Sequence, residues 1–180
     1  MKRSAKSLLY SVVVGASALG LAACGGGDDE SSNSGGGGGS TLTFSAANPA
    51  SQNTTVDVST AKTIGNDARA ADAFSSVPYC DVYFEDATGA NGKRYALQVY
   101  FRQTDRLPIN ASIVEGAGAA MWVAFDNDSG KAISGITVDT AARTLAFAAK
   151  VLKGSSGETV TINGTASFPK NATGTAGCGA

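Results

Sequence analysis

The chain has no histidine among its 180 residues, and this removes the commonest catalytic base. Ser-His-Asp and Cys-His nucleophiles and histidine-ligated metal sites are therefore excluded. Two Ser-x-x-Lys strings, Ser59 to Lys62 and Ser167 to Lys170, could place a serine beside a lysine that takes its proton. That chemistry needs the serine at the start of a helix, whereas the first string follows a strand-like run and the second contains a proline. We interpret both as surface residues.

Acidic residues could form a metal site between Asp126 and Gly130, which begins like a calcium loop with carboxylates at alternate positions. The twelfth position of such a loop should be glutamate, and here it is Thr137. A hairpin turn explains the same residues, so we expect no metal and no other cofactor.

Carboxylates could also act in pairs across a sugar-binding cleft, as in glycoside hydrolysis. The candidates are Asp81, Glu85, Glu115 and Asp126. Their spacing singles out no pair. A small hydrolase is thus an alternative, but we expect a protein that is not an enzyme.

The elements that must position any site are β-strands, because apolar residues recur at every second position after residue 41. Cys80, Val82 and Phe84 alternate with polar or aromatic residues, for example. The segments with this alternation are 42–46, 80–84, 95–101, 121–125, 145–147 and 160–168. No helical period explains so many of them.

Residues typical of turns separate these segments, at 87–92, 126–130, 139–142 and 154–157. We therefore predict an all-β fold, an antiparallel β-sandwich or small partly open barrel of about seven to nine strands. At most one short helix is expected, from Asn66 to Phe74, with Asn66 as its N-cap and Asp67 favoured by the helix dipole.

The alternation places several aromatic side chains on the face opposite the aliphatic ones. Tyr79, Tyr83, Tyr100 and Trp122 would point outward, where they could form a platform for a sugar ring or an extended peptide. Alternatively they only pair across the strands or lie beneath a covering segment, since aromatic residues favour strands in any case. These four are the candidate ligand-binding residues.

The N-terminus has the pattern of an export signal. Basic residues at positions 2, 3 and 6 precede an apolar run, residues 8–23, which is short for a membrane-spanning helix. The run ends in Leu21-Ala22-Ala23-Cys24, which resembles the lipobox of bacterial lipoproteins. The resemblance implies that residues 1–23 are a signal peptide and that Cys24 becomes the acylated first residue of the mature protein.

Acyl chains such as palmitate on Cys24 would hold the protein on a lipid bilayer. In lipoproteins kept at the inner membrane the residue after the cysteine tends to be aspartate, and here it is Gly25. If the host is Gram-negative, the resemblance thus implies the outer membrane, with the periplasmic or outward orientation left open.

Residues 24–40 should separate this anchor from the domain. After the cysteine they contain no apolar side chain, so we expect a disordered tether with a reach of roughly 20 Å. Residues 41–180 then form a single β domain. The whole chain has a formal net charge of -1, which loss of the basic signal makes more negative, so nucleic acid is excluded as a partner.

Two cysteines remain once Cys24 is acylated, and in an exported domain Cys80 and Cys178 most simply join each other. The bond would close a long loop and pin the polar C-terminal tail to the core. The sequence therefore predicts an exported, lipid-anchored envelope protein whose disulfide-linked β domain has a binding or structural role. Its partner would be an envelope protein, a peptide or a glycan.

Overall fold

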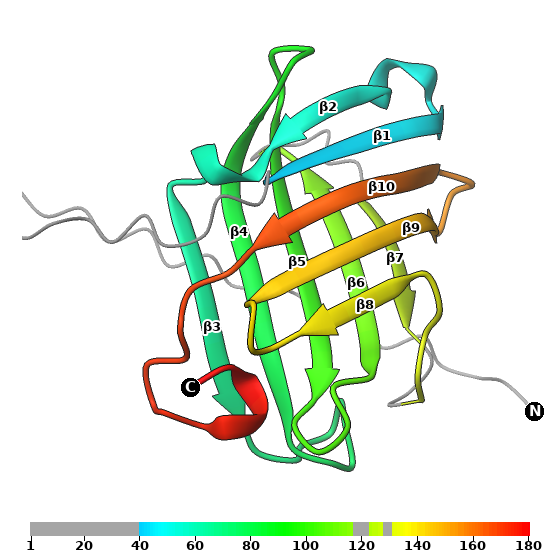
Figure 1. The fold of residues 1–180 in the computed structure, drawn as a ribbon. Helices are drawn as coiled ribbons and strands as arrows, with labels where there is room; N and C mark the ends of the chain where they lie inside the picture. Colours follow the sequence, from blue (N-terminus) through cyan, green and yellow to red (C-terminus); the bar gives the residue numbers. More distant parts are fainter. Residues whose placement is uncertain (1–39, 117–122, 128–130) are drawn as a thin grey trace, which may run out of the picture. The chain divides into compact units, whose positions relative to one another are not determined.

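The computed structural model describes residues 40–116, 123–127 and 131–180, all of which belong to one structural unit, Ser34–Ala180. In these residues the fold is all-β, as predicted, with ten strands and three short 3-10 turns (Figure 1). The strands are β1 (Thr41–Asn48), β2 (Thr54–Asp57), β3 (Thr63–Arg69), β4 (Tyr79–Gly89), β5 (Arg94–Arg102), β6 (Pro108–Glu115), β7 (Val123–Asn127), β8 (Ile136–Asp139), β9 (Thr144–Lys153) and β10 (Thr159–Ser167). The 3-10 turns are η1 (Ala50–Gln52), η2 (Val58–Thr60) and η3 (Ala176–Cys178). Across these ranges no helix combines the length and the apolar character that crossing a bilayer would require.

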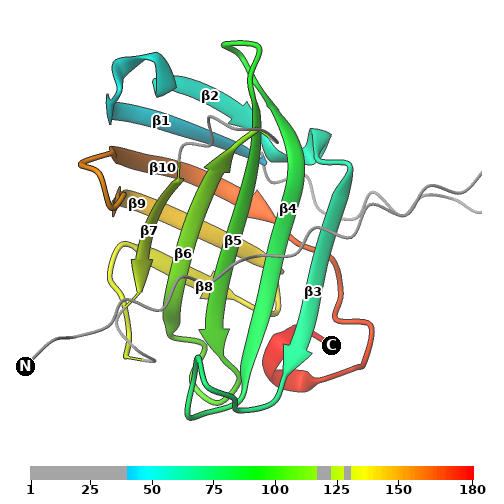
Figure 2. The same cartoon turned by 180° about the vertical axis from the view of Figure 1, so that it is seen from behind.

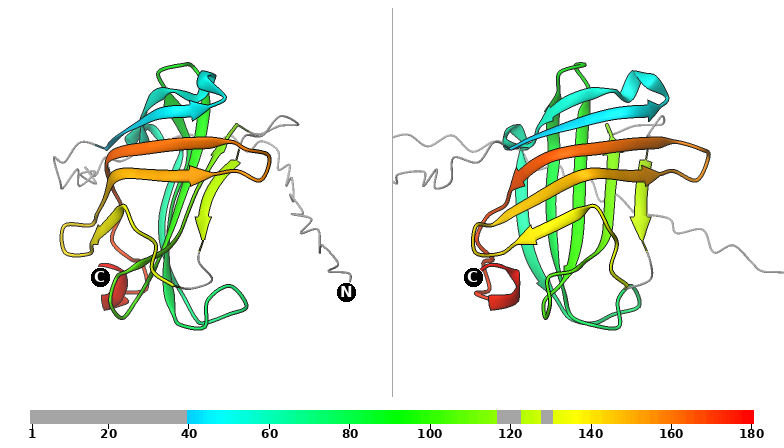
Figure 3. Two further views of the ribbon diagram at one scale, coloured as in Figure 1. Left: turned by 90° about the vertical axis from the view of Figure 1, so that its right-hand side faces the viewer. Right: turned by 45° about the vertical axis from the view of Figure 1, so that its right-hand side comes forward.

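The strands pair antiparallel in one sheet that nearly closes into a barrel. Its order is β10-β1-β2-β4-β5-β6-β7-β9-β8, β9 pairs also with β10, and β3 pairs with β4. Two layers result, in which β1, β10, β9 and β8 cross β3, β4, β5 and β6 at a large angle (Figures 1 and 3). The corners are the weakest pairings, with two residue pairs between β2 and β4 and one between β7 and β9.

Strand β4 belongs to both the β3 pairing and the β2 corner. Its residues 79–85 pair with β3, and its last two residues pair with β2. The register of β4 against β5 shifts between Phe84 and Ala87, where Asp86 has a φ of 62°. Such a bulge increases the local twist, which lets one strand serve two neighbours.

Alternating apolar side chains fill the space between the two layers, as the sequence pattern predicts. Val82, Phe84, Val99 and Ile162 are fully buried there. The alternation is broken once in β1, because Ala46 has a φ of 48° and the next inward residue is Ala47.

The predicted helix over Asn66–Phe74 is wrong, because Thr63–Arg69 form strand β3 and the residues after it form a loop. Asn66 does not cap a helix; its side-chain amide donates to the carbonyls of Pro169 and Cys178 at 3.1 and 2.6 Å. The C-terminal segment therefore supplies two acceptors for the inward amide of Asn66, while Ile64 and Ala68 on the same face of β3 pack against the core.

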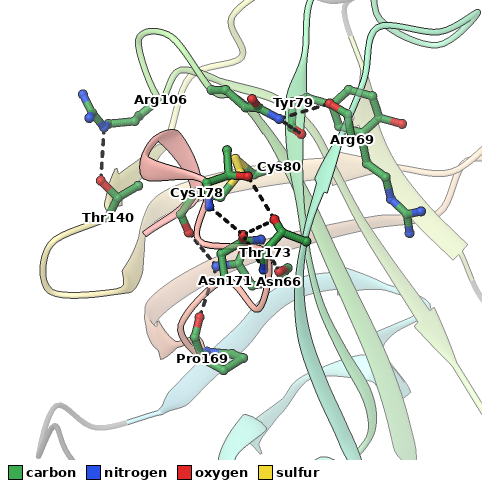
Figure 4. Close-up of a disulfide and its surroundings, with 12 residues drawn as sticks. Asn66, Arg69, Tyr79, Cys80, Arg106, Thr140, Pro169, Asn171, Thr173 and Cys178 are labelled. Atoms are coloured by element: carbon green, nitrogen blue, oxygen red, sulfur yellow. Dashed lines mark hydrogen bonds between the residues drawn. A yellow bond between two sulfur atoms is a disulfide. The ribbon is translucent and has the colours of Figure 1, made fainter. Parts of the chain in front are cut away.

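The predicted pairing of Cys80 with Cys178 is confirmed, with the two Cα atoms 5.6 Å apart (Figure 4). Both residues are fully buried. Asn171, also buried, donates from its side chain to the backbone carbonyl of Asn66 at 2.7 Å. The disulfide and these amide bonds hold the C-terminal segment against the inner side of β3.

Candidate functional site

A groove of about 350 Å³ lies on the outer face of the sheet formed by β3, β4, β5 and β6, the face turned to the viewer in Figure 2. Its position follows from strand parity, since residues that alternate with the buried core positions must point outward. The polar residues that line it include Asp67, Arg69, Asp81, Tyr83, Gln98 and Ser112. Ala96 lies beside them, and its small side chain leaves the face hollow at this point.

Asp81 is the most buried polar group of the groove, with a side chain only 7% exposed. Its carboxylate accepts a hydrogen bond from Gln98 Nε2 at 2.9 Å and lies 3.4 Å from Arg69 Nη2. Burial raises the pKa of Asp81, while Gln98 and Arg69 act in the opposite direction. The fold therefore holds a carboxylate in a place that disfavours its charge, although the strand alternation allows any outward residue there.

Arg69 connects the two carboxylates of the groove that face each other across β3 and β4. Asp67 and Asp81 are cross-strand partners, and Arg69 Nη2 lies 3.1 Å from the first and 3.4 Å from the second. The arginine side chain is about half exposed, so its remaining donors face solvent.

Tyr83 forms one side of the groove because its cross-strand partner on β3 is a glycine. A Cβ on Gly65 would lie 2.0 Å from Tyr83 Cζ, so the ring occupies the space that any other side chain would fill. Burial, together with the carboxylates of Asp67 and Glu85, raises the pKa of Tyr83. Its phenol is thus a neutral donor at ordinary pH.

The candidates Tyr79 and Tyr100 lie on the same outer face but form a separate cluster with Phe74. Their ring centroids are 5.1 Å apart, and the Phe74 ring lies 5.8 Å from Tyr79 and 4.9 Å from Tyr100. Asp72, in the loop before β4, accepts from the Tyr79 hydroxyl at 3.0 Å, and burial with this bond raises the pKa of Tyr79 to about 12. A loop therefore covers Tyr79, which is the alternative that the sequence left open for these aromatics.

The other sequence candidates are engaged elsewhere. Ser59 Oγ donates to Asp57 at 2.6 Å, while Lys62 Nζ pairs with Asp86. The first Ser-x-x-Lys string thus forms no serine–lysine contact of the kind that acyl-enzymes need.

Two of the four acidic candidates lie away from the groove and pair with lysines. Glu115 pairs with Lys93 at 2.9 Å and accepts from Gln52, and Asp126 accepts from the buried Lys150. Only Asp81 and Glu85 line the groove. Within the described ranges, no group of three acidic, cysteine or histidine residues is arranged to hold a metal ion.

Trp122 and Cys24 lie outside the described residues, as do the expected signal peptide, the expected tether up to residue 39 and residues 128–130 of the predicted turn that begins like a calcium loop. Of the four aromatic candidates the structure therefore places three on one face of the sheet, and one of them, Tyr83, in the groove.

Sequence reasoning missed Arg69, Asp67 and Gln98. Gln98 could have been found, because it alternates with Leu97 and Val99 and so must point outward. Arg69 and Asp67 could not, since their local pattern favours a helix and only the pairing of β3 with β4 brings them to this face.

No family model, curated protein or solved structure matches the chain. Function must therefore be inferred from the chemistry of the site and from the sequence of the N-terminus.

Proposed function

We propose that this chain is a lipid-anchored, non-catalytic binding protein of the bacterial envelope, and that it takes its ligand in the groove on the outer face of β3–β6. The observation that supports it best is Asp81, a carboxylate held in a largely buried, outward position beside a guanidinium and an amide. Burying a charged group lowers the stability of the fold. Such groups are therefore retained mainly where they serve a function, and they concentrate at functional sites.

The anchor is supported by the sequence alone. The lipobox-like Leu21-Ala22-Ala23-Cys24 follows a basic start and an apolar run, and the polar segment after it provides the length of a tether. The disulfide between Cys80 and Cys178 fits an oxidising compartment, which is where an exported domain would lie.

A non-catalytic role is supported by the lack of histidine and by the state of the candidate nucleophiles. Ser59 and Lys62 are each bound to a different acid. The closest carboxylates of the groove, those of Asp67 and Asp81, lie 3.1 and 3.4 Å from the same atom, Arg69 Nη2. Glycoside hydrolysis needs two carboxyl groups that both face the sugar, whereas here a guanidinium lies between them.

The anchor is tested by Cys24→Ser in cells supplied with labelled palmitate. We expect the label to be lost and the protein to leave the membrane fraction, whereas the matched control Cys178→Ser keeps both. A Cys24→Ser variant that still carries the label and stays in the membrane fraction would contradict the anchor.

Binding is tested by a photo-crosslinking residue, p-benzoylphenylalanine, placed at Ser112 in the groove and, as a control, at Ala146. Ala146 is exposed on β9, on the outer face of the other layer. We expect a light-dependent adduct at Ser112 and none at Ala146 in intact cells. Equal adducts at both positions, or none at either, would contradict a binding function of the groove.

A further inference from the structure

We infer that the ligand of the groove is a non-acidic saccharide, bound through its hydroxyl groups by Asp81, Gln98 and Arg69 beside the ring of Tyr83. This inference depends on the proposed binding function, and it names the chemical class of the ligand.

The backbone of β4 and β5 beneath the groove leaves nothing for an extended peptide to pair with. At the open edge of β3, the carbonyls of Asn66 and Arg69 are already used by the side chains of Asn171 and Gln103. Strands β4 and β5 are interior strands, and their pairing runs through the middle of the groove, with Tyr83 opposite Gln98 and Gln98 opposite Ser112. Their N–H and C=O groups are therefore used between neighbouring strands. Peptides that bind sheets add to an open edge through main-chain hydrogen bonds, so a ligand on this face must be bound by side chains.

The side chains of the groove alternate donors with acceptors at short range. The Asp81 carboxylate accepts, the Arg69 guanidinium donates, and the amide of Gln98 can do both. Gln98 Nε2 is used by Asp81, and among the described residues its Oε1 and the Tyr83 hydroxyl take part in no hydrogen bond. A hydroxyl group is at once donor and acceptor, so adjacent hydroxyls on a sugar ring match this set.

The charge and the volume of the groove restrict the class of ligand further. Three carboxylates, those of Asp67, Asp81 and Glu85, line the groove together with one guanidinium, that of Arg69. An acidic sugar would meet net negative charge there, whereas a neutral or amine-bearing sugar would not. A volume of about 350 Å³ is at the lower end for ligand pockets and suits one or two sugar rings of a longer chain.

The test uses the purified full chain in detergent and three oligosaccharides of equal length, observed by calorimetry. The probes are chito-oligosaccharide, its deacetylated cationic form and oligogalacturonate, which is anionic. We expect binding of the first two, no binding of the third and no shortening of any of them during incubation.

Variants show whether the binding occurs in the groove. Gln98→Leu keeps the size of the side chain and removes its amide, and it should weaken binding at least about tenfold, the loss of one or two hydrogen bonds. Gly65→Ala should also weaken it, because the new methyl group displaces the Tyr83 ring. Thr137→Val, at an exposed position of β8, is the control and should leave affinity unchanged. Circular dichroism shows that each variant is folded.

The results separate the ligand class from the binding function. If protease digests the molecule that is crosslinked at Ser112, and no saccharide binds, the ligand is a protein or peptide. That result would overturn the saccharide and keep the binding function. Tightest binding of the anionic probe, or equal affinity of wild type and Gln98→Leu, would also overturn the inference. No adduct and no saccharide binding would overturn both proposals, and release of shorter sugars would contradict the non-catalytic role.

Discussion

The two faces of β4 and β5 differ although neighbouring residues of the same strands form them. On the inner face Val82, Phe84 and Val99 are fully buried in the apolar core. On the outer face, one residue away, Asp81 and Gln98 line a polar groove. Strand alternation explains where the residues of both faces lie. The free energy of burying apolar side chains explains the residue types of the inner face, but not the polar residues of the outer face.

This difference indicates which face of the sheet carries the candidate functional residues. An inner residue of β4 stabilises the fold because folding removes its apolar surface from contact with water. The outer Asp81 is nearly as buried, yet burial disfavours its charge and raises its pKa. The inner face should therefore determine stability, and the outer face should contribute little to it.

The largest effect is expected from truncation on the inner face. Phe84→Ala should lower the free energy of unfolding by about 3–5 kcal/mol, because it leaves a cavity in a closely packed core. Tyr83→Ala, its neighbour on the outer face, should lower it by no more than about 1 kcal/mol. Urea unfolding of the full chain in detergent measures both. Equal losses would mean that the outer aromatic is as structural as the inner one.

A smaller loss is expected when the C-terminal segment is released from the inner side of β3. Cys178→Ser removes a bond that closes a loop with a sequence separation of 98, and it should lower the free energy of unfolding by about 2–5 kcal/mol. The double variant Cys80→Ser/Cys178→Ser should lose no more than the single one, because both remove the same bond. Thermal unfolding with and without reductant provides the measurement. Losses that add would show that the two sulfurs act separately.

The smallest effect is expected from Asp81→Asn on the outer face. The raised pKa means that the folded protein holds this proton more tightly than the unfolded chain does. Protonated Asp81 therefore favours folding at a pH below its unfolded pKa of about 4, and this contribution is lost as the pH rises through the folded value.

Asp81→Asn should thus unfold within about 1 kcal/mol of wild type at neutral pH, with its relative stability increasing from about pH 3 to about pH 7. Arg69 is not left as a buried unpaired charge, because it is about half exposed and keeps Asp67. Unfolding curves at several pH values measure this. A loss well above about 2 kcal/mol at neutral pH would make Asp81 a structural anchor.

The sequence predicts the parts of the fold that local periodicity controls. The alternation of Asp81 with Val82 sets the two faces of β4, and Asp139 accepts from the backbone N–H groups of Ala141 and Ala142 in the predicted turn between β8 and β9. Strand parity alone is thus enough to place Asp81, Tyr83 and Gln98 on one face.

Strand β3 could not be predicted, because its stability depends on distant residues. Asn66 is an inward polar residue whose partners are carbonyls more than a hundred positions away. Locally, Asn66 and Asp67 fit the start of a helix, and this signal is misleading. Asp67 and Arg69 lie in the groove only because this strand forms, so these two of the four charged residues of the site could not be predicted from the sequence.

The corner between β2 and β4 has a mechanical consequence. If the proposed membrane anchor and a ligand in the groove were pulled apart, the tension would enter the domain at β1 and reach β4 through β2. The strand pairing along this path is denser between β1 and β2, where four residue pairs join the strands, than at the corner, where two do. Under load the corner should open before either layer shears, so the domain would lengthen by a hinge while the groove keeps its shape.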